Sequence, residues 1–219
     1  ASLGEASLKD TAAAGKRWEA DRTNVQAGMA YVRQLEALGQ TQQQMQVLDE
    51  LAGHHPQDMR LQAYYGKQLV RTGQSARAIP VLQNVVKSGK ADWKTYSALG
   101  SAHDQNGRYV KARQYYETAL KSRPGEASIM NNIGMSNRLE GNLPQAEAIL
   151  KKANAQPNSR RQPRVRQNLA LAVGLQGRFD EARDIASRDL PPEQVEANLA
   201  FLKKMMSQNN TWQQLKPAG

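Results

Sequence analysis

Two short amphipathic patterns separated by a glycine recur along this chain, and residues 93–126 show them most clearly. Tyr96, Leu99 and His103 stand at i, i+3 and i+7, the spacing that places side chains on one face of a helix. Gly107 follows where that helix would end, because the left-handed residue that often caps a helix is most readily glycine. A second apolar face follows, made by Ala112, Tyr116, Ala119 and Leu120. The pattern predicts a helical hairpin that is too small to bury its own apolar face.

The hairpin pattern repeats at a nearly fixed period. Its turn glycines are separated by 34, 34, 34 and 36 residues, and they are Gly39, Gly73, Gly107, Gly141 and Gly177. Small residues recur in step, at Gly66, Gly100, Gly134 and Ala170 in the first helices and at Ala78, Ala112, Ala146 and Ala182 in the second. Such residues let paired helices approach to roughly 8–10 Å. The chain thus resembles the tetratricopeptide repeat, whose period is 34, although Tyr96 stands where the consensus has Trp.

This resemblance predicts an all-α fold, a solenoid of helix hairpins in a right-handed superhelix with a capping helix at its C-terminal end. We predict a tether over residues 1–22, five repeats over 23–189, the capping helix over 190–207 and a tail over 208–219. The tether has no sustained apolar period, but Trp18 is expected to dock on the first repeat.

The capping helix is predicted from an apolar stripe at i, i+4, i+7 and i+11, formed by Val195, Leu199, Leu202 and Met206. A helix of this kind covers the open end of a repeat array. A helix lying on a membrane surface is the alternative, but only Lys203 and Lys204 are basic there.

Composition limits the remaining possibilities. The absence of Cys excludes disulfides, thiolate catalysis and zinc sites that use Cys. No apolar run approaches the ~18–20 residues of a membrane span. The sequence starts at Ala1 without Met, so we expect a processed or trimmed product, from which any signal sequence or lipid anchor would have been lost.

The net charge of +10 is concentrated in one region. Residues 59–126 carry +8, whereas residues 1–58 carry −3. A positive field of this kind favours an acidic partner by steering its approach.

The sequence shows no recognisable catalytic motif. We find no nucleophile with a base beside it, no Gly-rich phosphate loop and no pair of zinc-binding histidines on a helix. His54 and His55 are adjacent, but a metal site needs three or four convergent ligands, so a solvated turn is the simpler interpretation. We therefore predict neither an enzyme nor a cofactor or metal site.

The candidate binding surface is the groove formed by the first helices of stacked hairpins. Its predicted residues are Arg60, Lys67, Arg71, Lys94, Ser97, Ser101, Asn131, Met135, Arg138, Arg164, Gln167 and Leu171. Arg and Asn can hydrogen-bond an extended segment, while Met and Leu can form small apolar pockets. The alternative is that these side chains are simply solvated.

One known way of binding peptides is not expected. In the tetratricopeptide clamp for a terminal carboxylate, Asn132 and Arg164 would fit two of the positions. Ser97 and Ser101, however, stand where Lys and Asn are needed. We therefore expect an extended, acidic-to-neutral protein segment along the concave face.

A narrower resemblance lies in the C-terminal half. It begins at Asn131–Gly134 and includes the runs RVRQNLALAVGLQGRFDEA, at 164–182, and RDLPPEQVEANLAFLKKM, at 188–205. These look like the TadD family, the tetratricopeptide lipoproteins of the tight-adherence (Flp, type IVb) pilus assembly system. The resemblance implies a pilotin-like protein on the periplasmic face of the outer membrane that supports the pilus secretin. The missing Cys departs from a lipoprotein, whose anchoring Cys would lie upstream of Ala1.

Two other functions stay open at this point. One is a generic tetratricopeptide adaptor. The other is a basic nucleic-acid reader, since some helical repeats read one base each and the sequence pI is about 9.9. The groove lacks a regular pair of base-reading side chains, which favours the protein partner.

Overall fold

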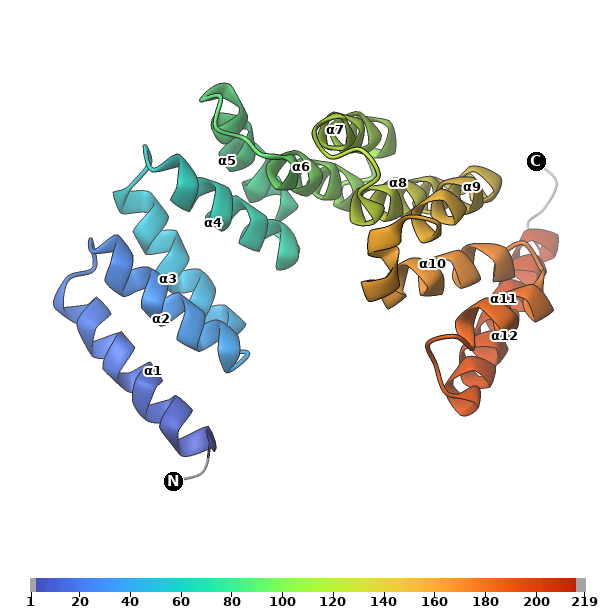
Figure 1. The fold of residues 1–219 in the computed structure, drawn as a ribbon, viewed down its shortest axis with the longest axis horizontal. Helices are drawn as coiled ribbons and strands as arrows, with labels where there is room; N and C mark the ends of the chain where they lie inside the picture. Colours follow the sequence, from blue (N-terminus) through green and yellow to red (C-terminus); the bar gives the residue numbers. More distant parts are fainter. Residues whose placement is uncertain (1–2, 216–219) are drawn as a thin grey trace. The chain divides into compact units, whose positions relative to one another are not determined.

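A computed structural model of the protein describes residues 3–215, with side chains over residues 8–208. Over that range the chain forms twelve α-helices and one short 3-10 helix, and it contains no strand. The prediction of an all-α fold of helix hairpins is confirmed. Figure 1 follows the helices in chain order. They fall into two compact units, Ala1–Asn106 (unit 1) and Gly107–Gly219 (unit 2).

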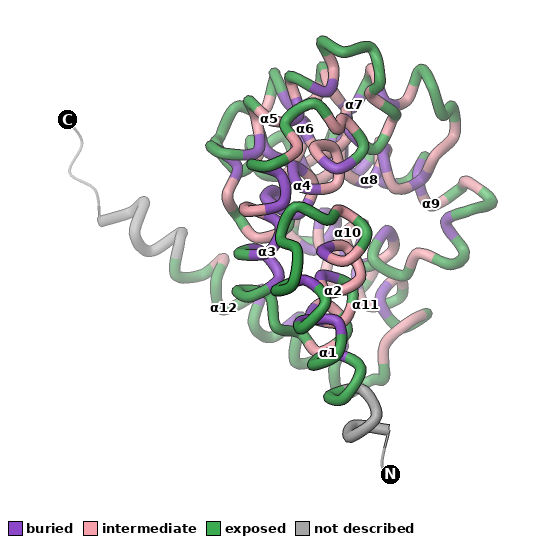
Figure 2. The backbone as a smooth tube through the Cα atoms, turned by 90° about the vertical axis from the view of Figure 1, so that its left-hand side faces the viewer, coloured by how far each residue is buried: buried purple, intermediate pink, exposed green. Residues whose placement is uncertain are grey.

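Unit 1 is built from helices that pack against their neighbours in sequence. They are α1 (Leu3–Ala20), α2 (Val25–Ala37), α3 (Thr41–His54), α4 (Met59–Arg71), α5 (Ser75–Lys87) and α6 (Trp93–Gln105). Leu35, Leu51 and Leu82 are completely buried between them. Figure 2 shows that buried positions recur from hairpin to hairpin. The core is therefore distributed along the repeats, as expected for an array.

The segment predicted as a tether is instead helical from Leu3 to Ala20 and packs against α2. Thr11, Ala14 and Trp18, spaced at i, i+3 and i+7, are buried. The predicted docking of Trp18 is confirmed, since a Cβ on Gly28 would lie 2.9 Å from its ring. The tether prediction was wrong because the stripe has only three members and two of them are small. Ala-rich segments also have high helix propensity.

Unit 2 continues the hairpin pattern. Its helices are α7 (Tyr109–Ser122), α8 (Ala127–Glu140), α9 (Leu143–Asn154), the 3-10 helix η1 (Pro157–Arg161), α10 (Pro163–Gly174), α11 (Phe179–Ala186) and α12 (Pro192–Leu215). Leu150, Leu169 and Val173 lie in its apolar core with Val195 and Leu199 of α12. The longer linker before the fifth repeat forms η1, which packs against α8, α9 and α10.

The predicted central hairpin is divided between the two units, because the boundary falls between Asn106 and Gly107. Its first helix, α6, packs on α4 and α5 within unit 1 and buries Leu99. Its second helix, α7, packs on α8 within unit 2 and buries Tyr116. The repeat that shows the sequence pattern most clearly therefore supplies one helix to each unit.

Glycine has two separate uses in the hairpins. Gly141 has φ = 93° and ends α8 in the left-handed conformation, which a side chain would strain. Gly134 lies inside α8, where a Cβ would come within 2.6 Å of Leu150 Cγ on α9. Gly66 has the same relation to Leu82, also at 2.6 Å. The predicted close approach of paired helices at these small residues is thus what the structure shows.

The predicted capping helix is present and is longer than expected. Helix α12 runs to Leu215, so it extends into the predicted tail at 208–219; residues 216–219 of that tail lie outside the described range. Val195, Leu199 and Leu202 are buried against the preceding hairpin. A Cβ on Gly174 would lie 2.7 Å from Leu202. Helix α12 therefore covers the apolar face of the fifth repeat.

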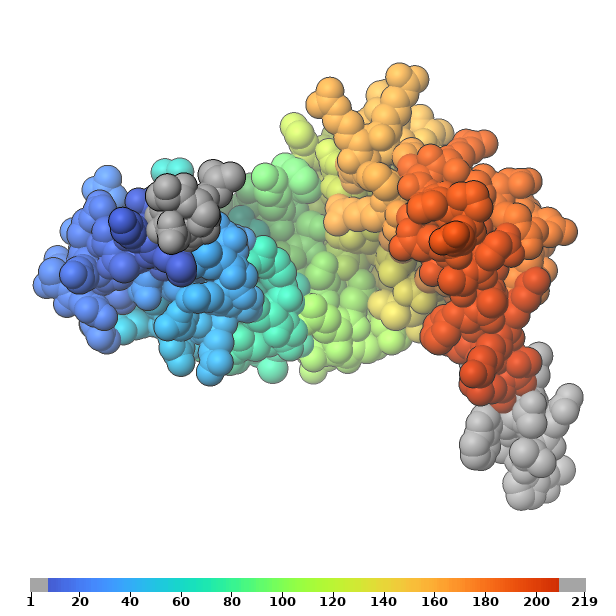
Figure 3. All heavy atoms as spheres, turned by 90° about the horizontal axis from the view of Figure 1, so that it is seen from below, coloured from blue at the N-terminus to red at the C-terminus, as the bar shows by residue number. Residues whose placement is uncertain are grey.

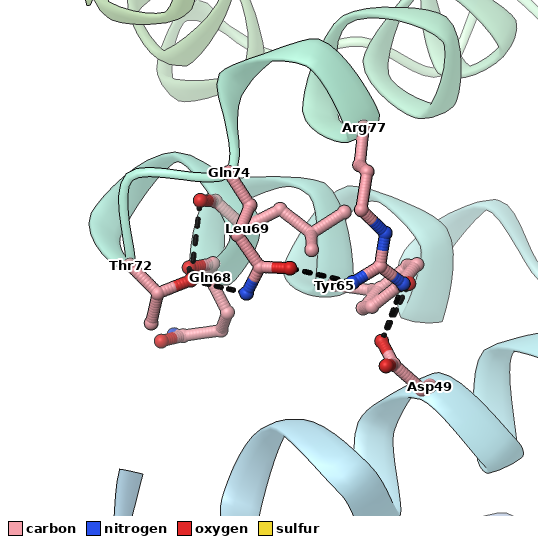
Figure 4. A network of polar contacts seen from close by, with 7 residues as sticks. All are labelled: Asp49, Tyr65, Gln68, Leu69, Thr72, Gln74 and Arg77. Carbon is pink, nitrogen blue, oxygen red and sulfur yellow. Dashed lines mark hydrogen bonds and ion pairs between the residues drawn. The ribbon is translucent and has the colours of Figure 1, made fainter. Parts of the chain in front are cut away.

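A polar network joins the first and second repeats in unit 1 (Figure 4). The Tyr65 hydroxyl donates to Asp49 at 2.6 Å, and Arg77 donates to both the same carboxylate at 3.0 Å and the Tyr65 oxygen at 2.8 Å. Burial, together with the hydrogen bond to Asp49, raises the pKa of Tyr65 to about 12. Tyr65 is therefore a hydrogen-bond donor at neutral pH and serves repeat packing.

Candidate functional site

The first helices of unit 1 enclose a groove of about 890 Å³. The residues that line it come from α2, from α4 with the loop before it, and from α6 with the loop before it. They are Val25, Met29, Arg33, Gln57, Asp58, Met59, Arg60, Leu61, Ala63, Tyr64, Lys67, Lys90, Asp92 and Thr95. We call this the basic groove. In the surface of Figure 3, the colour bar gives blue for α2, cyan for α4 and green for α6.

The two carboxylates of the basic groove are already engaged by helix ends. Asp58 caps α4 by accepting from the backbone N–H groups of Arg60 and Leu61, both at 3.0 Å. Asp92 caps α6 by accepting from the N–H and the hydroxyl of Thr95, both at 2.8 Å. Burial raises the pKa of Asp92, but the bonds from Thr95 and the nearby Lys67 and Lys94 outweigh burial and lower it. Both carboxylates therefore serve the local fold.

Four cations of the basic groove have no carboxylate partner. Arg33, Arg60, Lys67 and Lys90 make no ion pair with any residue in the described part of the chain. Met29 and Tyr64 line the groove beside these cations. Cationic heads around apolar side chains suit a segment that carries carboxylates and buries some of its own apolar surface.

The structure separates the predicted binding residues of unit 1. Arg60 and Lys67 line the basic groove. Arg71 instead pairs with Glu36 at 2.8 Å, and Tyr64 donates to the same carboxylate at 3.3 Å. The Lys94 ammonium lies 5.6 Å from the centre of the Trp93 ring, and Lys94 does not line the groove. Ser97 and Ser101 are half-buried on α6, and neither lines the groove.

Unit 2 has a second pocket of about 460 Å³, and its lining is mostly apolar. Its residues come from α8, from α10 and α11 with the loop after each, and from α12. They are Arg138, Gln167, Asn168, Ala170, Leu171, Leu175, Ala182, Ala186, Leu190, Val195, Asn198, Leu199, Phe201, Leu202 and Met205. We call this the apolar pocket. Part of the α12 surface is seen in red in Figure 3.

Three of the predicted residues of unit 2, Arg138, Gln167 and Leu171, line the apolar pocket. Asn131 does not face solvent: it is 3% exposed and accepts a hydrogen bond from Asn168 at 2.8 Å. This amide pair joins α8 to α10, so the prediction that Asn131 binds a partner was wrong. Met135 is half-buried and Arg164 is exposed, and neither lines the pocket.

Sequence reasoning missed several lining residues that the repeat period could have found. Arg33 stands 34 residues before Lys67, at the same position of the preceding first helix. Continued along the chain, this position holds Ser101, Met135 and Leu171. Along unit 1 the series runs from the basic Arg33 and Lys67 to the polar Ser101, and in unit 2 it is apolar; Arg33 and Lys67 line the basic groove and Leu171 lines the apolar pocket. Phe201 and Met205 were missed because only one face of the capping helix was considered.

The remaining ionised clusters hold helices together. Arg166 donates to both oxygens of Asp189, at 2.7 and 2.6 Å, and the two side chains are largely buried. Glu147 accepts from Lys151, Gln176 and Arg178. Burial raises its pKa, but these three partners lower it from the ordinary 4.5 to about 2. The two clusters tie α10 and the loop after it to their neighbours.

Within the described residues, no group of three His, Asp or Glu side chains is placed to hold a metal ion. His55 donates from Nε2 to the Thr23 carbonyl at 2.5 Å. None of the described helices combines the length and the apolar character needed to cross a bilayer.

Comparisons with known proteins agree with the repeat assignment. The tetratricopeptide repeat family model matches residues 65–127 and 97–160. No curated protein sequence matches the chain.

Solved structures extend the likeness to most of the chain. TTC0263, a thermophilic TPR protein of Thermus thermophilus, superposes with a TM-score of 0.66 at 22% identity and covers 81% of this chain and 97% of its own. MamA from AMB-1 superposes with a TM-score of 0.62 at 20% identity, and the match covers 71% of this chain and 92% of MamA. YrrB, described as a TPR protein with an unusual peptide-binding site, superposes with a TM-score of 0.57 at 14% identity, and the match covers 88% of this chain and 98% of YrrB. At these identities the likeness shows the fold alone.

Proposed function

We propose that this array of tetratricopeptide repeats is a non-enzymatic scaffold that holds an extended, acidic-to-neutral segment of a partner protein in the basic groove of unit 1. The observation that carries the proposal is the set of four cations without ion-pair partners, Arg33, Arg60, Lys67 and Lys90, around Met29 and Tyr64. The groove's own two carboxylates cap helices and form no ion pair with these four cations, which they leave in excess. A structural neighbour described as having a peptide-binding site, YrrB, supports this kind of ligand.

Affinity in such a groove is expected to be modest and sensitive to salt. Exposed charge pairs contribute only about 0–1 kcal/mol each, and salt screens them. The charges would bring the segment to the groove and set its position, while burial of its apolar side chains against Met29 and Tyr64 would add affinity.

The partner is assigned from the resemblance of residues 131–205 to the TadD family. On that basis we place the protein on the periplasmic face of the outer membrane, as a lipoprotein that supports the secretin of the Flp pilus in a pilotin-like role. A generic adaptor is the alternative. Crosslinking in cells followed by mass spectrometry separates the two: recovery of the secretin or another pilus component supports the pilus role, and its absence from the crosslinked products overturns it.

The basic groove is tested with a fluorescein-labelled 12-residue peptide of alternating Glu and Ala. The test variant reverses Arg60, Lys67 and Lys90 to Glu. The control variant reverses Lys16, Arg17 and Lys87 to Glu, which changes the net charge equally but alters exposed residues outside the groove. We expect the groove variant to bind at least tenfold more weakly than the control in low salt, with both variants folded by circular dichroism.

Two results would contradict the proposal. Equal weakening by both triple variants would show that net charge alone attracts the peptide. Tight binding of single-stranded RNA at moderate salt, with no peptide binding, would favour the nucleic-acid reader.

A further inference from the structure

The apolar pocket of unit 2 is open to solvent although most of its lining is hydrophobic. Of its fifteen lining residues, eleven are apolar and only Arg138 is charged. Phe201 and Met205, one turn apart on α12, are 69% and 36% exposed. Large apolar side chains that face solvent beside a concave apolar surface mark sites where another molecule binds.

Arg138 lies at the wall of this pocket without a partner. It makes no ion pair and no side-chain hydrogen bond with the described residues, and its Nε is buried. Its two terminal guanidinium nitrogens are not among the buried atoms, so a carboxylate in the pocket can reach them and form a charge-assisted hydrogen bond. The residue is therefore placed to receive an anionic group from a ligand.

Two carboxylates that directly adjoin lining residues in the sequence are already paired. Glu196 of α12 pairs with Arg183 at 2.6 Å, and Asp189 pairs with Arg166. The ammonium of Lys203 lies 4.9 Å from the centre of the Phe179 ring. No acidic side chain lines the pocket, so Arg138 gives it a positive charge that unit 2 does not neutralise at that point.

We propose that the apolar pocket binds an apolar side chain of a partner protein together with the carboxylate of an adjacent Asp or Glu, which pairs with Arg138. This inference rests on the proposed function, in that the array binds protein segments, but it concerns a separate surface with a different chemistry. In the basic groove of unit 1, charge would contribute most of the binding specificity. In the apolar pocket, burial of the partner's side chain against Leu171, Phe201 and Met205 would contribute most of the affinity. Arg138 would favour partners that carry Asp or Glu next to that side chain.

The test uses the full chain and a fluorescein-labelled peptide, Gly-Ser-Glu-Leu-Phe-Gly-Ser amide. One matched peptide has Gln in place of Glu, and another has Ser in place of Leu and Phe. Binding is measured by fluorescence anisotropy to the wild type and to Arg138→Gln, Phe201→Ser and Arg164→Gln. Arg164→Gln is the control, because it removes an exposed positive charge of α10 outside the pocket.

We expect the wild type and Arg164→Gln to prefer the Glu peptide over the Gln peptide by about tenfold, which is the typical effect of a hydrogen bond to a charged group. Arg138→Gln should abolish that preference while still binding the Gln peptide. Phe201→Ser should weaken the binding of the Glu and Gln peptides about tenfold, because the bound peptide would lose its apolar contact with the Phe201 ring. Thermal unfolding of each variant checks that the fold is kept.

Several outcomes would overturn the inference. The first is that Arg138→Gln keeps the preference for the Glu peptide. The second is that the Ser peptide binds as tightly as the Glu peptide, and the third is that no peptide binds the wild type. The fourth is that dodecanoate binds and no peptide does, which would indicate that the ligand is a free amphiphile. The triple variant of the basic groove should bind the Glu-Leu-Phe peptide normally. If the 12-residue Glu-Ala peptide binds the basic groove and the Glu-Leu-Phe peptide does not bind, only the inference about the apolar pocket fails.

Discussion

Replacing Gly134 by Ala tests whether close packing of paired helices, and not helix propensity, decides stability in this array. Gly134 lies inside α8, and an added Cβ would come within 2.6 Å of Leu150 Cγ and 2.9 Å of Leu150 Cδ2. It would also lie 3.3 Å from the Ala146 carbonyl oxygen, which belongs to the backbone of α9. Leu150 is completely buried, so its side chain has little room to move.

Two opposing terms set the expected magnitude. Ala in place of Gly inside a helix gains about 1 kcal/mol of propensity. Overpacking a well-filled core costs about 1–3 kcal/mol, and the upper part of that range, about 2–3 kcal/mol, applies here because the backbone of α9 would have to shift as well as Leu150. We expect a net loss of about 1–2 kcal/mol in the free energy of unfolding, measured from urea denaturation followed by circular dichroism.

Gly53→Ala provides the matched control. Gly53 is also helical, in α3, but no atom lies within 4 Å of the position its Cβ would take. That variant should be as stable as the wild type or more stable, by up to about 1 kcal/mol. If Gly134→Ala were also as stable as the wild type, the close approach of α8 and α9 would not need glycine and the reasoning would be refuted.

Three further predictions concern the ends of the array and its buried carboxylate. Trp18→Ala should cost about 3–5 kcal/mol, typical of a large buried aromatic residue, and should remove hydrogen-exchange protection from α1; retained protection would contradict the docking of α1 by Trp18. Ending the chain after Leu190 removes α12 and should cause aggregation in size-exclusion chromatography, because the partners of Leu199 and Leu202 become exposed; an equally stable, monodisperse product would disprove the capping role. Glu147→Gln should destabilise the protein at pH 7. Since folding lowers the pKa of Glu147 from 4.5 to about 2, its stabilising effect is complete above the ordinary pKa and is lost as the pH falls toward 2. The difference in the free energy of unfolding between Glu147→Gln and the wild type, measured by urea titration, should therefore shrink as the pH falls over that range. A difference that stays constant with pH would contradict this role of Glu147.

The hairpins could be predicted from the sequence because each depends on local information. The turn glycines, the small residues at helix crossings and the apolar stripes all recur at the repeat period, and each hairpin packs mainly on its immediate neighbours. The capping helix was found for the same reason, from the stripe that begins at Val195. The first helix was missed because Thr11, Ala14 and Trp18 form too short a stripe to stand out from an Ala-rich segment.

Only the tertiary structure decided which groove-facing side chains are available to a partner. Arg71 and Lys67 are both basic residues of α4, yet Glu36 reaches Arg71 and leaves Lys67 without an ion pair. Asn131 is buried because Asn168 of the next first helix meets it, a contact between residues 37 positions apart. The sequence by itself determined the phase of each helix, since helical periodicity is a local property. Pairing and burial of polar groups depend on which neighbours the stacked helices bring within hydrogen-bond distance, and that distance is set only when the repeats pack.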